Sequence, residues 1–172
     1  QMVRSPSELF SYPDSSLFRL LSDDRIEADK ALARELGCQA GDEWVRISGL
    51  RTLGPEGLPI CWADVYVIPE YGSIAQRLGG GSRPVYEMIA ETFKESIENI
   101  TIRLTAGVLS EQKAEVLGVE AGSPSLSVSR FYQGRGGRIF EVSISEHPAS
   151  NFSYTFEFTR GWQTADHWSW SN

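Results

Sequence analysis

LGCQAGDEWVRISGLR at residues 36–51 and LGVEAGSPSLSVSRFY at residues 117–132 share one pattern, and the second stretch starts 81 positions after the first. In each stretch Leu-Gly ends a helix-like segment, a second glycine follows four residues later, and an alternating segment then begins. A glycine directly after a helix is typical of a left-handed C-cap, and strict alternation indicates a strand. The repetition predicts two copies of a unit in which a short helix turns into a β-hairpin.

The composition is that of one ordinary globular domain. The chain has 172 residues, of which 41% are hydrophobic and 23% charged, which is enough apolar mass for a core. Its formal net charge of −7 makes the surface repel phosphate backbones, so this chain by itself is a poor candidate for binding nucleic acid. No stretch approaches the roughly 18 consecutive apolar residues that a membrane span needs, and no secretion signal is evident. We therefore expect a cytoplasmic protein without membrane contact.

The cysteines and histidines do not suggest a metal centre. Cys38 and Cys61 are too few for a disulfide framework and lack metal-ligand spacing, so buried free thiols are the simpler interpretation. His147 and His167 form neither an HExxH motif nor a closely spaced pair. We expect neither a metal nor another cofactor.

Periodicity places the helices and strands along the chain. Asp29 and Ser110 suit helix N-caps, and Gly37 and Gly118 suit the ends of the same two helices. A further amphipathic helix over residues 84–96 would lie across the sheet. Alternation predicts strands over residues 18–28, 44–53, 60–68, 100–106, 126–132, 138–146 and 152–158. The predicted fold is α+β, with one antiparallel sheet built from two strand-helix-hairpin units and helices covering its buried face.

The two ends of the chain fit neither copy of the unit. Residues 1–15 are rich in Ser and Pro and predict an irregular lead-in, and residues 159–172 form a tail with three tryptophans. The tail could pack on the body or a partner, or be disordered. We expect one domain over residues 16–158.

Four segments, in order, resemble a known family. They are EADKALARELGCQAGDEWVRISGLR, GLPICWADVYVIPEY, SEQKAEVLGVEAGSPSLSVSRFY and GRIFEVSISEH. The set is similar to the effector-binding UTRA domain of GntR-type bacterial transcription regulators, in the HutC branch. The resemblance implies a chorismate lyase-like fold, a small-molecule pocket between sheet and helices, and a homodimer. It also implies a winged helix-turn-helix domain before residues 1–15, through which alone operator DNA would be bound.

Two arginines are the first candidates for ligand contact. By the resemblance, Arg51 matches the second arginine of an Arg-x-Arg pair in the family, and Gly49 stands in the place of the first. Arg130 lies on an otherwise apolar strand face, where a buried guanidinium needs an anion. Glu141, on the pairing strand, matches a glutamate of the family's last hairpin. Either Arg130 and Glu141 form a structural ion pair, or the arginines hold a ligand carboxylate or phosphate while Glu141 accepts from a ligand hydroxyl or amine.

Further candidates shape the expected ligand class. Ala63 stands where many family members have a glutamate, so together with the glycine on the preceding strand the site lacks one charge of each sign. This favours a carboxylate metabolite over a sugar phosphate. Tyr66 and Tyr154 are the aromatic residues that we assign to the pocket, and Ser143 is a further ligand-binding candidate. Backbone amides up to Ser82 could hold an anion at the start of the following helix, or the glycine run is a flexible linker that ends in a helix N-cap at Ser82.

Three functions fit these observations. The leading interpretation is a non-enzymatic sensor that binds a small organic anion and controls operator binding by the intact dimer. A chorismate lyase-like enzyme acting on a small aromatic carboxylate is the alternative, with Glu141 as acid or base. Against it, the sequence suggests no histidine on a strand near that site and no nucleophile motif. A protein-interaction module that uses the tryptophan-rich tail is the third.

Overall fold

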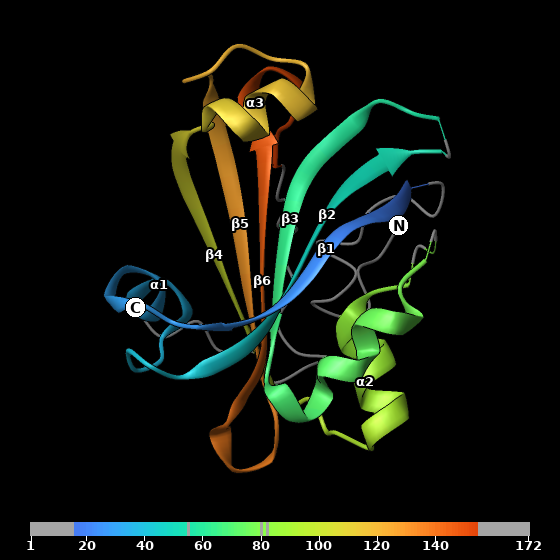
Figure 1. The fold of residues 1–172 in the computed structure, drawn as a ribbon, viewed down its shortest axis with the longest axis vertical. Coiled ribbons are helices and arrows are strands. Elements are labelled where there is room, and N and C mark those ends of the chain that lie inside the picture. The colour runs from blue at the N-terminus through green and yellow to red at the C-terminus, as the bar shows by residue number, and fades with distance from the viewer. Residues whose placement is uncertain (1–15, 55, 80, 82, 155–172) are drawn as a thin grey trace, which may run out of the picture.

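The chain folds into a single antiparallel sheet. A computed structural model describes residues 16–54, 56–79, 81 and 83–154, so the predicted lead-in and tail lie outside the described residues. The regular elements are β1 (Ser16–Glu27), α1 (Lys30–Leu36), β2 (Glu43–Leu53), β3 (Pro59–Val67), η2 (Pro69–Arg77), α2 (Val85–Phe93), β4 (Asn99–Val108), α3 (Glu111–Leu117), β5 (Pro124–Gln133), η3 (Arg135–Gly137), β6 (Ile139–Pro148) and η4 (Ala149–Asn151). The strand order is β1-β2-β3-β6-β5-β4, so the two copies meet at β3 and β6 (Figure 1). The predicted α+β class is confirmed.

The polar and glycine residues repeated in the two copies form the predicted helix caps. The side chains of Asp29 and Ser110 each accept a hydrogen bond from a backbone N–H in the first turn of the helix that follows. Gly37 and Gly118 end these helices with φ of 72° and 70°, a conformation that costs glycine nothing. The hairpin strands after these turns, β2 and β5, again start 81 residues apart.

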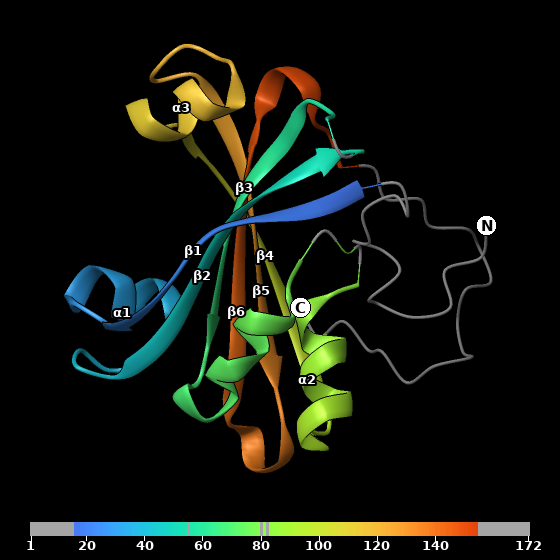
Figure 2. The same cartoon turned by 45° about the vertical axis from the view of Figure 1, so that its right-hand side comes forward.

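The two repeated helices pack against the same face of the sheet. α3 packs on Leu50 and Trp62, and α1 contributes to the core that contains Trp44 and Tyr66. These four residues occupy alternate positions of β2 and β3, so they share one face. Figure 2 shows α1 and α3 on this side, as the duplicated unit predicts.

The segment between the two copies lies over the opposite face. η2 was not predicted from the sequence, because it is a short segment that contains Pro69 and Gly72 and buries only Ile74 and Ala75. Gly72 lets η2 approach β2 closely, since a Cβ there would lie 2.7 Å from Val45 Cγ2. Tyr71 stacks on Phe93 with ring centroids 4.5 Å apart and so joins η2 to α2. α2 ends three residues before the predicted limit of 96, where Lys94 adopts a left-handed φ of 56°.

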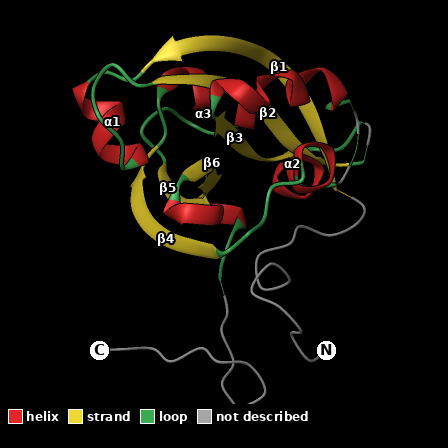
Figure 3. Ribbon diagram, turned by 90° about the horizontal axis from the view of Figure 1, so that it is seen from below, coloured by secondary structure: helices red, strands yellow, loops and turns green. Residues whose placement is uncertain are grey.

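The remaining differences concern strand ends. β6 continues to Pro148, two residues beyond the predicted limit, and η4 follows it. Residues 152–154 are not in a strand, and the rest of the strand predicted over residues 152–158 lies outside the described residues. Figure 3 shows the result from below, with β1 and β4 at the two edges of the twisted sheet. Within the described residues, no helix is long and apolar enough to cross a membrane.

Candidate functional site

Five of the candidate residues lie on one face of the sheet. Directly paired residues in an antiparallel sheet point to the same side. The register pairs Arg130 with Ser143, which is itself paired with Val65, two residues after Ala63 on the same strand. The same alternation places Arg51 and Glu141 on this side. We call this side, which η2 and α2 cover, the polar face.

Small side chains separate the two arginines on the polar face. Gly49 pairs with Ala63, Ala63 pairs with Ser145, and Ser143 lies beside them on β6. Arg51 lies on β2 and Arg130 on β5, three strands away across the sheet, and the two residues are also offset by two side-chain rows along the strands. In an ideal sheet this separates their Cα atoms by about 20 Å. Each arginine therefore suits its own end of a ligand better than a carboxylate shared by both.

An aromatic ring covers the Arg51 end. The guanidinium carbon of Arg51 lies 5.6 Å from the centroid of the Phe18 ring. A Cβ on Gly49 would meet Phe18 Cζ at 2.3 Å, so the ring occupies the space above this glycine. The backbone N–H of Phe18 donates to the carbonyl of Gly81 at 3.1 Å. Phe18 was not among the site residues predicted from the sequence, where its signal is a glycine inside a strand, which often marks a close approach.

The Arg130 end is more deeply buried. Arg130 is 8% exposed, and its Nη2 donates to the hydroxyl of Tyr154 at 3.3 Å. Burial raises the pKa of Tyr154, so the phenol stays protonated at neutral pH. Tyr154 is held by an edge-on contact with Phe152, at a centroid distance of 4.9 Å. The structure thus brings Tyr154 to Arg130.

Glu141 lies beside Arg130 but does not form the ion pair that we considered. Its side chain is 2% exposed, and none of the residues that the structure describes forms a hydrogen bond with its Oε1 atom. Burial raises the pKa of Glu141 to about 8, an increase that Arg130 only partly offsets. Among the described residues, Glu141 takes part in none of the ion pairs.

A histidine also lies on the polar face, and the expectation of none near the site is wrong. His147 pairs with Leu126 of β5 and is fully buried. Its Nδ1 lies 3.2 Å from the Leu126 carbonyl oxygen, which can only accept, so Nδ1 carries the proton. Burial lowers the pKa of His147 to about 4. Its ring stacks on that of Phe152, with 3.6 Å between the ring centroids. The alternation along residues 141–147 held the signal, but the predicted strand stopped at residue 146.

Two predicted site residues do not join this cluster. Tyr66 pairs with Arg46 and Val142 on the opposite face, where it is buried in the core. Burial and the nearby carboxylate of Asp64 raise its pKa, as expected for a packed phenol. Ser82 lies outside the described residues.

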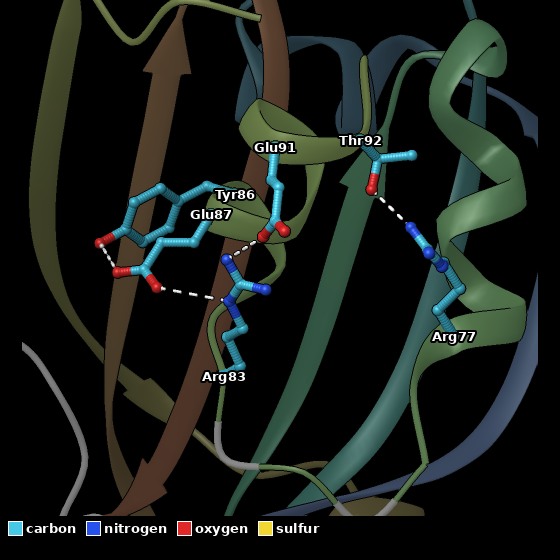
Figure 4. Close-up of polar contacts among 6 residues, drawn as sticks. All are labelled: Arg77, Arg83, Tyr86, Glu87, Glu91 and Thr92. Carbon is cyan, nitrogen blue, oxygen red and sulfur yellow. Dashed lines mark hydrogen bonds and ion pairs between the residues drawn. The ribbon is translucent and has the colours of Figure 1, made fainter. Parts of the chain in front are cut away.

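A pocket of about 240 Å³ opens elsewhere, between η2 and α2. It is lined by Arg77, Arg83, Met88, Glu91 and Thr92. Arg77 donates to the Thr92 hydroxyl at 2.6 Å, and Arg83 forms ion pairs with Glu87 and Glu91 (Figure 4). These charges neutralise one another at the surface, so the pocket offers little to an ionic ligand. Within the described part of the chain, no cluster of three or more His, Cys, Asp and Glu side chains could hold a metal ion.

The chain is thus an α+β domain whose antiparallel sheet carries charged side chains on the face that η2 and α2 cover. The UTRA domain family matches residues 15–153, and the chain belongs to this family. No curated protein matches the chain.

Several solved structures share the fold. The ligand-binding domain of a GntR-family transcriptional regulator from Bordetella bronchiseptica is 22% identical, with a TM-score of 0.69 over 87% of this chain and 93% of that one. A GntR-family regulator from Bacillus cereus gives 17% identity and a TM-score of 0.69 over 84% and 99%. PhnF from Mycobacterium smegmatis gives 14% identity and a TM-score of 0.68 over 84% of this chain. The match spans 63% of the length of PhnF, and 88% of the PhnF effector domain alone.

Proposed function

We propose that this chain is the effector-sensing domain of a GntR-type transcription regulator of the HutC branch, and that it binds a small organic anion on the polar face. In the intact protein, a homodimer in the cytoplasm, binding would alter operator affinity through a DNA-binding domain that precedes residues 1–15. Membership of the UTRA family and the likeness to effector domains of GntR regulators support this function. The coupling required is modest, about 1 to 3 kcal/mol.

The observation that carries the anion proposal is the burial of Arg130. A guanidinium that is 8% exposed among small and apolar neighbours is costly unless negative charge lies close to it. Glu141 beside it is mostly protonated at neutral pH, because its pKa is about 8. The buried guanidinium presents a fork of N–H donors, which would bind a ligand carboxylate more strongly here than at the surface.

Phe18 favours a carboxylate with an apolar or aromatic body over a sugar phosphate. Its ring occupies the space above Gly49, beside Arg51. Ala63, which pairs with Gly49, adds a methyl group to the same part of the polar face. A sugar phosphate needs several polar contacts for its hydroxyl groups, whereas the described residues at this end of the face offer an aromatic surface and one cation.

Thermal-shift screening tests the function directly. Carboxylates, amino-acid catabolites and sugar phosphates should be compared at equal concentration, because a ligand that binds only the folded state raises the melting temperature. We expect the largest shift from a carboxylate with an apolar body. A panel in which only sugar phosphates raise the melting temperature would contradict the ligand class, and one without any shift would contradict the function.

One observation favours the enzymatic alternative. Glu141, with a pKa of about 8, could serve as a general acid, and the neutral His147 lies on the same face. A chorismate lyase-like activity would release pyruvate from chorismate. Incubation with chorismate followed by pyruvate assay separates the two functions, and we expect no release above the level of a Glu141→Gln variant.

A further inference from the structure

The two edges of the sheet are built differently. β1 carries charged residues along its length, namely Arg19, Asp23, Asp24, Arg25 and Glu27. Its register with β2 also shifts between Leu20 and Ser22. Charged side chains and an irregular register keep an edge strand from pairing with another chain. β4, at the other edge, has Arg103 as its one charged residue and pairs with β5 without a register shift over residues 99–108 (Figure 3). β4 therefore lacks the protection that β1 has.

β4 also presents an apolar row to solvent. Ile102 pairs with Arg130, so alternate residues of β4 lie on the polar face. All of these residues are apolar, namely Ile100, Ile102, Leu104, Ala106 and Val108. Leu104 is 41% exposed and Val108 67%. Within the part of the chain that the structure describes, β4 pairs with β5 alone. An open strand edge that carries an apolar row is suited to the addition of a further strand.

The distribution of charge favours a second copy of this chain as the added strand. Two copies that each carry a net charge of −7 repel one another unless they meet at a surface without carboxylates. β4 and its neighbour β5 contain no Asp or Glu, whereas β1 contains three. β4 is therefore the edge at which two acidic copies can approach each other.

The order of residues along β4 is self-complementary. Antiparallel pairing about a two-fold axis at Leu104 sets Ile100 opposite Val108 and Ile102 opposite Ala106. Every pair in the row on the polar face is then apolar, and Arg103 lies opposite Thr105 of the second copy. An axis one residue earlier would set the two copies of Arg103 directly opposite each other, which is destabilising. The sequence of β4 thus specifies one register.

We propose that β4 pairs with β4 of a second copy, antiparallel about Leu104, and joins the two sheets into one. This inference rests on the proposed function, whose homodimer it assigns to one edge of the sheet. Paired residues of an antiparallel sheet point to the same side, so the polar faces of both copies lie on one side of the joined sheet. Ile102, the partner of Arg130, then lies in the interface itself. An effector bound at Arg130 is one strand away from the second copy.

The mass of the chain as a function of concentration tests the pairing. One strand edge forms an interface at the small end of the specific range, below about 1,200 Å² in total. We expect a dissociation constant on the order of micromolar, so sedimentation velocity should cover about 1 to 200 µM of the 172-residue chain. The sedimentation coefficient should rise from that of a monomer to that of a dimer across this range.

Leu104→Lys tests the position of the axis. The substitution sets two lysines opposite each other and should weaken the dimer by at least about tenfold. Leu21→Lys is the matched control, because Leu21 is 45% exposed on the edge strand β1 and the change in net charge is the same. It should leave the dimer unchanged. Both side chains are exposed, so the fold should survive either substitution.

Leu104→Cys provides a measurement that does not depend on loss of binding. Directly opposite Cβ atoms in an antiparallel pair lie about 4.5 to 5.5 Å apart, close to the spacing that a disulfide requires. Mild oxidation should therefore cross-link this variant to itself. Leu21→Cys should not cross-link, and the wild-type chain gives the background from Cys38 and Cys61.

The outcomes separate the pairing from the proposed function. A dimer that Leu104→Lys leaves intact, or that Leu104→Cys does not cross-link, would overturn the pairing and leave the homodimer standing. A chain that becomes dimeric only after removal of residues 159–172 would assign the edge to its own tail and would also overturn the pairing. A chain that is monomeric at every concentration would count against both the pairing and the homodimer. None of these results alters the ligand response, which thermal-shift screening measures separately.

Discussion

Glu141 should make the folded protein less stable as pH rises. Its folded pKa of about 8 exceeds the ordinary value of 4.5, so the folded state binds more protons than the unfolded state between these limits. The free energy of unfolding should fall over this range, by an amount on the order of 3 to 5 kcal/mol from this residue. Urea denaturation of Glu141→Gln should show a flatter pH profile than the wild type and greater stability at pH 8. Glu98→Gln, which removes a carboxylate from an exposed position, is the control for the general effect of this substitution.

His147 should act in the opposite direction at acid pH. Its pKa is lowered from 6.5 to about 4, so the unfolded state binds the proton more readily between these values. Stability should decrease as pH falls from 6.5 to 4, by roughly 3 kcal/mol from this residue. The slope of unfolding free energy against pH in this window should be smaller in His147→Asn, whatever the absolute stability of the variant. Equal slopes in the two proteins would show that the ring is not buried in its neutral form.

Gly49 should tolerate no side chain. An added Cβ would lie 2.3 Å from Phe18 Cζ and 2.6 Å from the backbone oxygen of Arg19, so the ring and strand β1 would both have to move. Gly49→Ala should cost about 1 to 3 kcal/mol of unfolding free energy. Gly107→Ala is the matched strand control, because its Cβ would meet only Ser125 Oγ, at 3.5 Å. Similar losses in the two variants would argue against the close contact with Phe18.

At the scale of elements, the repeated helices depend on their caps. The side chain of Asp29 accepts from Leu32 N at 2.8 Å, and that of Ser110 from Lys113 N at 3.4 Å. Replacing either by alanine should cost about 1 kcal/mol, and Asp29→Ala should cost more because its hydrogen bond is shorter and charged. Chemical denaturation of the two single variants checks this order. A larger loss from Ser110→Ala would contradict it.

Local signals predicted some elements well and others poorly. The caps of α1 and α3 were predictable because Asp29, Gly37, Ser110 and Gly118 act within one turn of the chain. The end of α2 was not, since Lys94 adopts the left-handed conformation there and no glycine marks it. η2 escaped prediction because only Ile74 and Ala75 of its residues are buried, which is too few to form a recognisable apolar stripe.

At the scale of the whole molecule, strand register decided which candidates come together. Alternation predicted that Ser143 and Glu141 share one face of their strand, and the register with β5 sets Arg130 on the same side. Tyr66 was misplaced because it follows Ala63 by an odd number of residues, which puts the two side chains on opposite faces. The contact of Phe18 with Gly49 and Arg51 depends on the pairing of β1 with β2, which no local pattern specifies.

The central claim is that the polar face binds an organic anion through its arginines. The most direct test is the affinity of the best carboxylate from the screen, measured by calorimetry for the wild type, Arg51→Gln, Arg130→Gln and Arg103→Gln. Arg103 serves as the control because it lies on β4 with its side chain on the opposite face, 4.9 Å from the Phe131 ring. We expect Arg130→Gln to weaken binding by at least about tenfold, Arg51→Gln to weaken it less, and Arg103→Gln to leave it unchanged. Unaltered affinity in both Arg51→Gln and Arg130→Gln would contradict the claim.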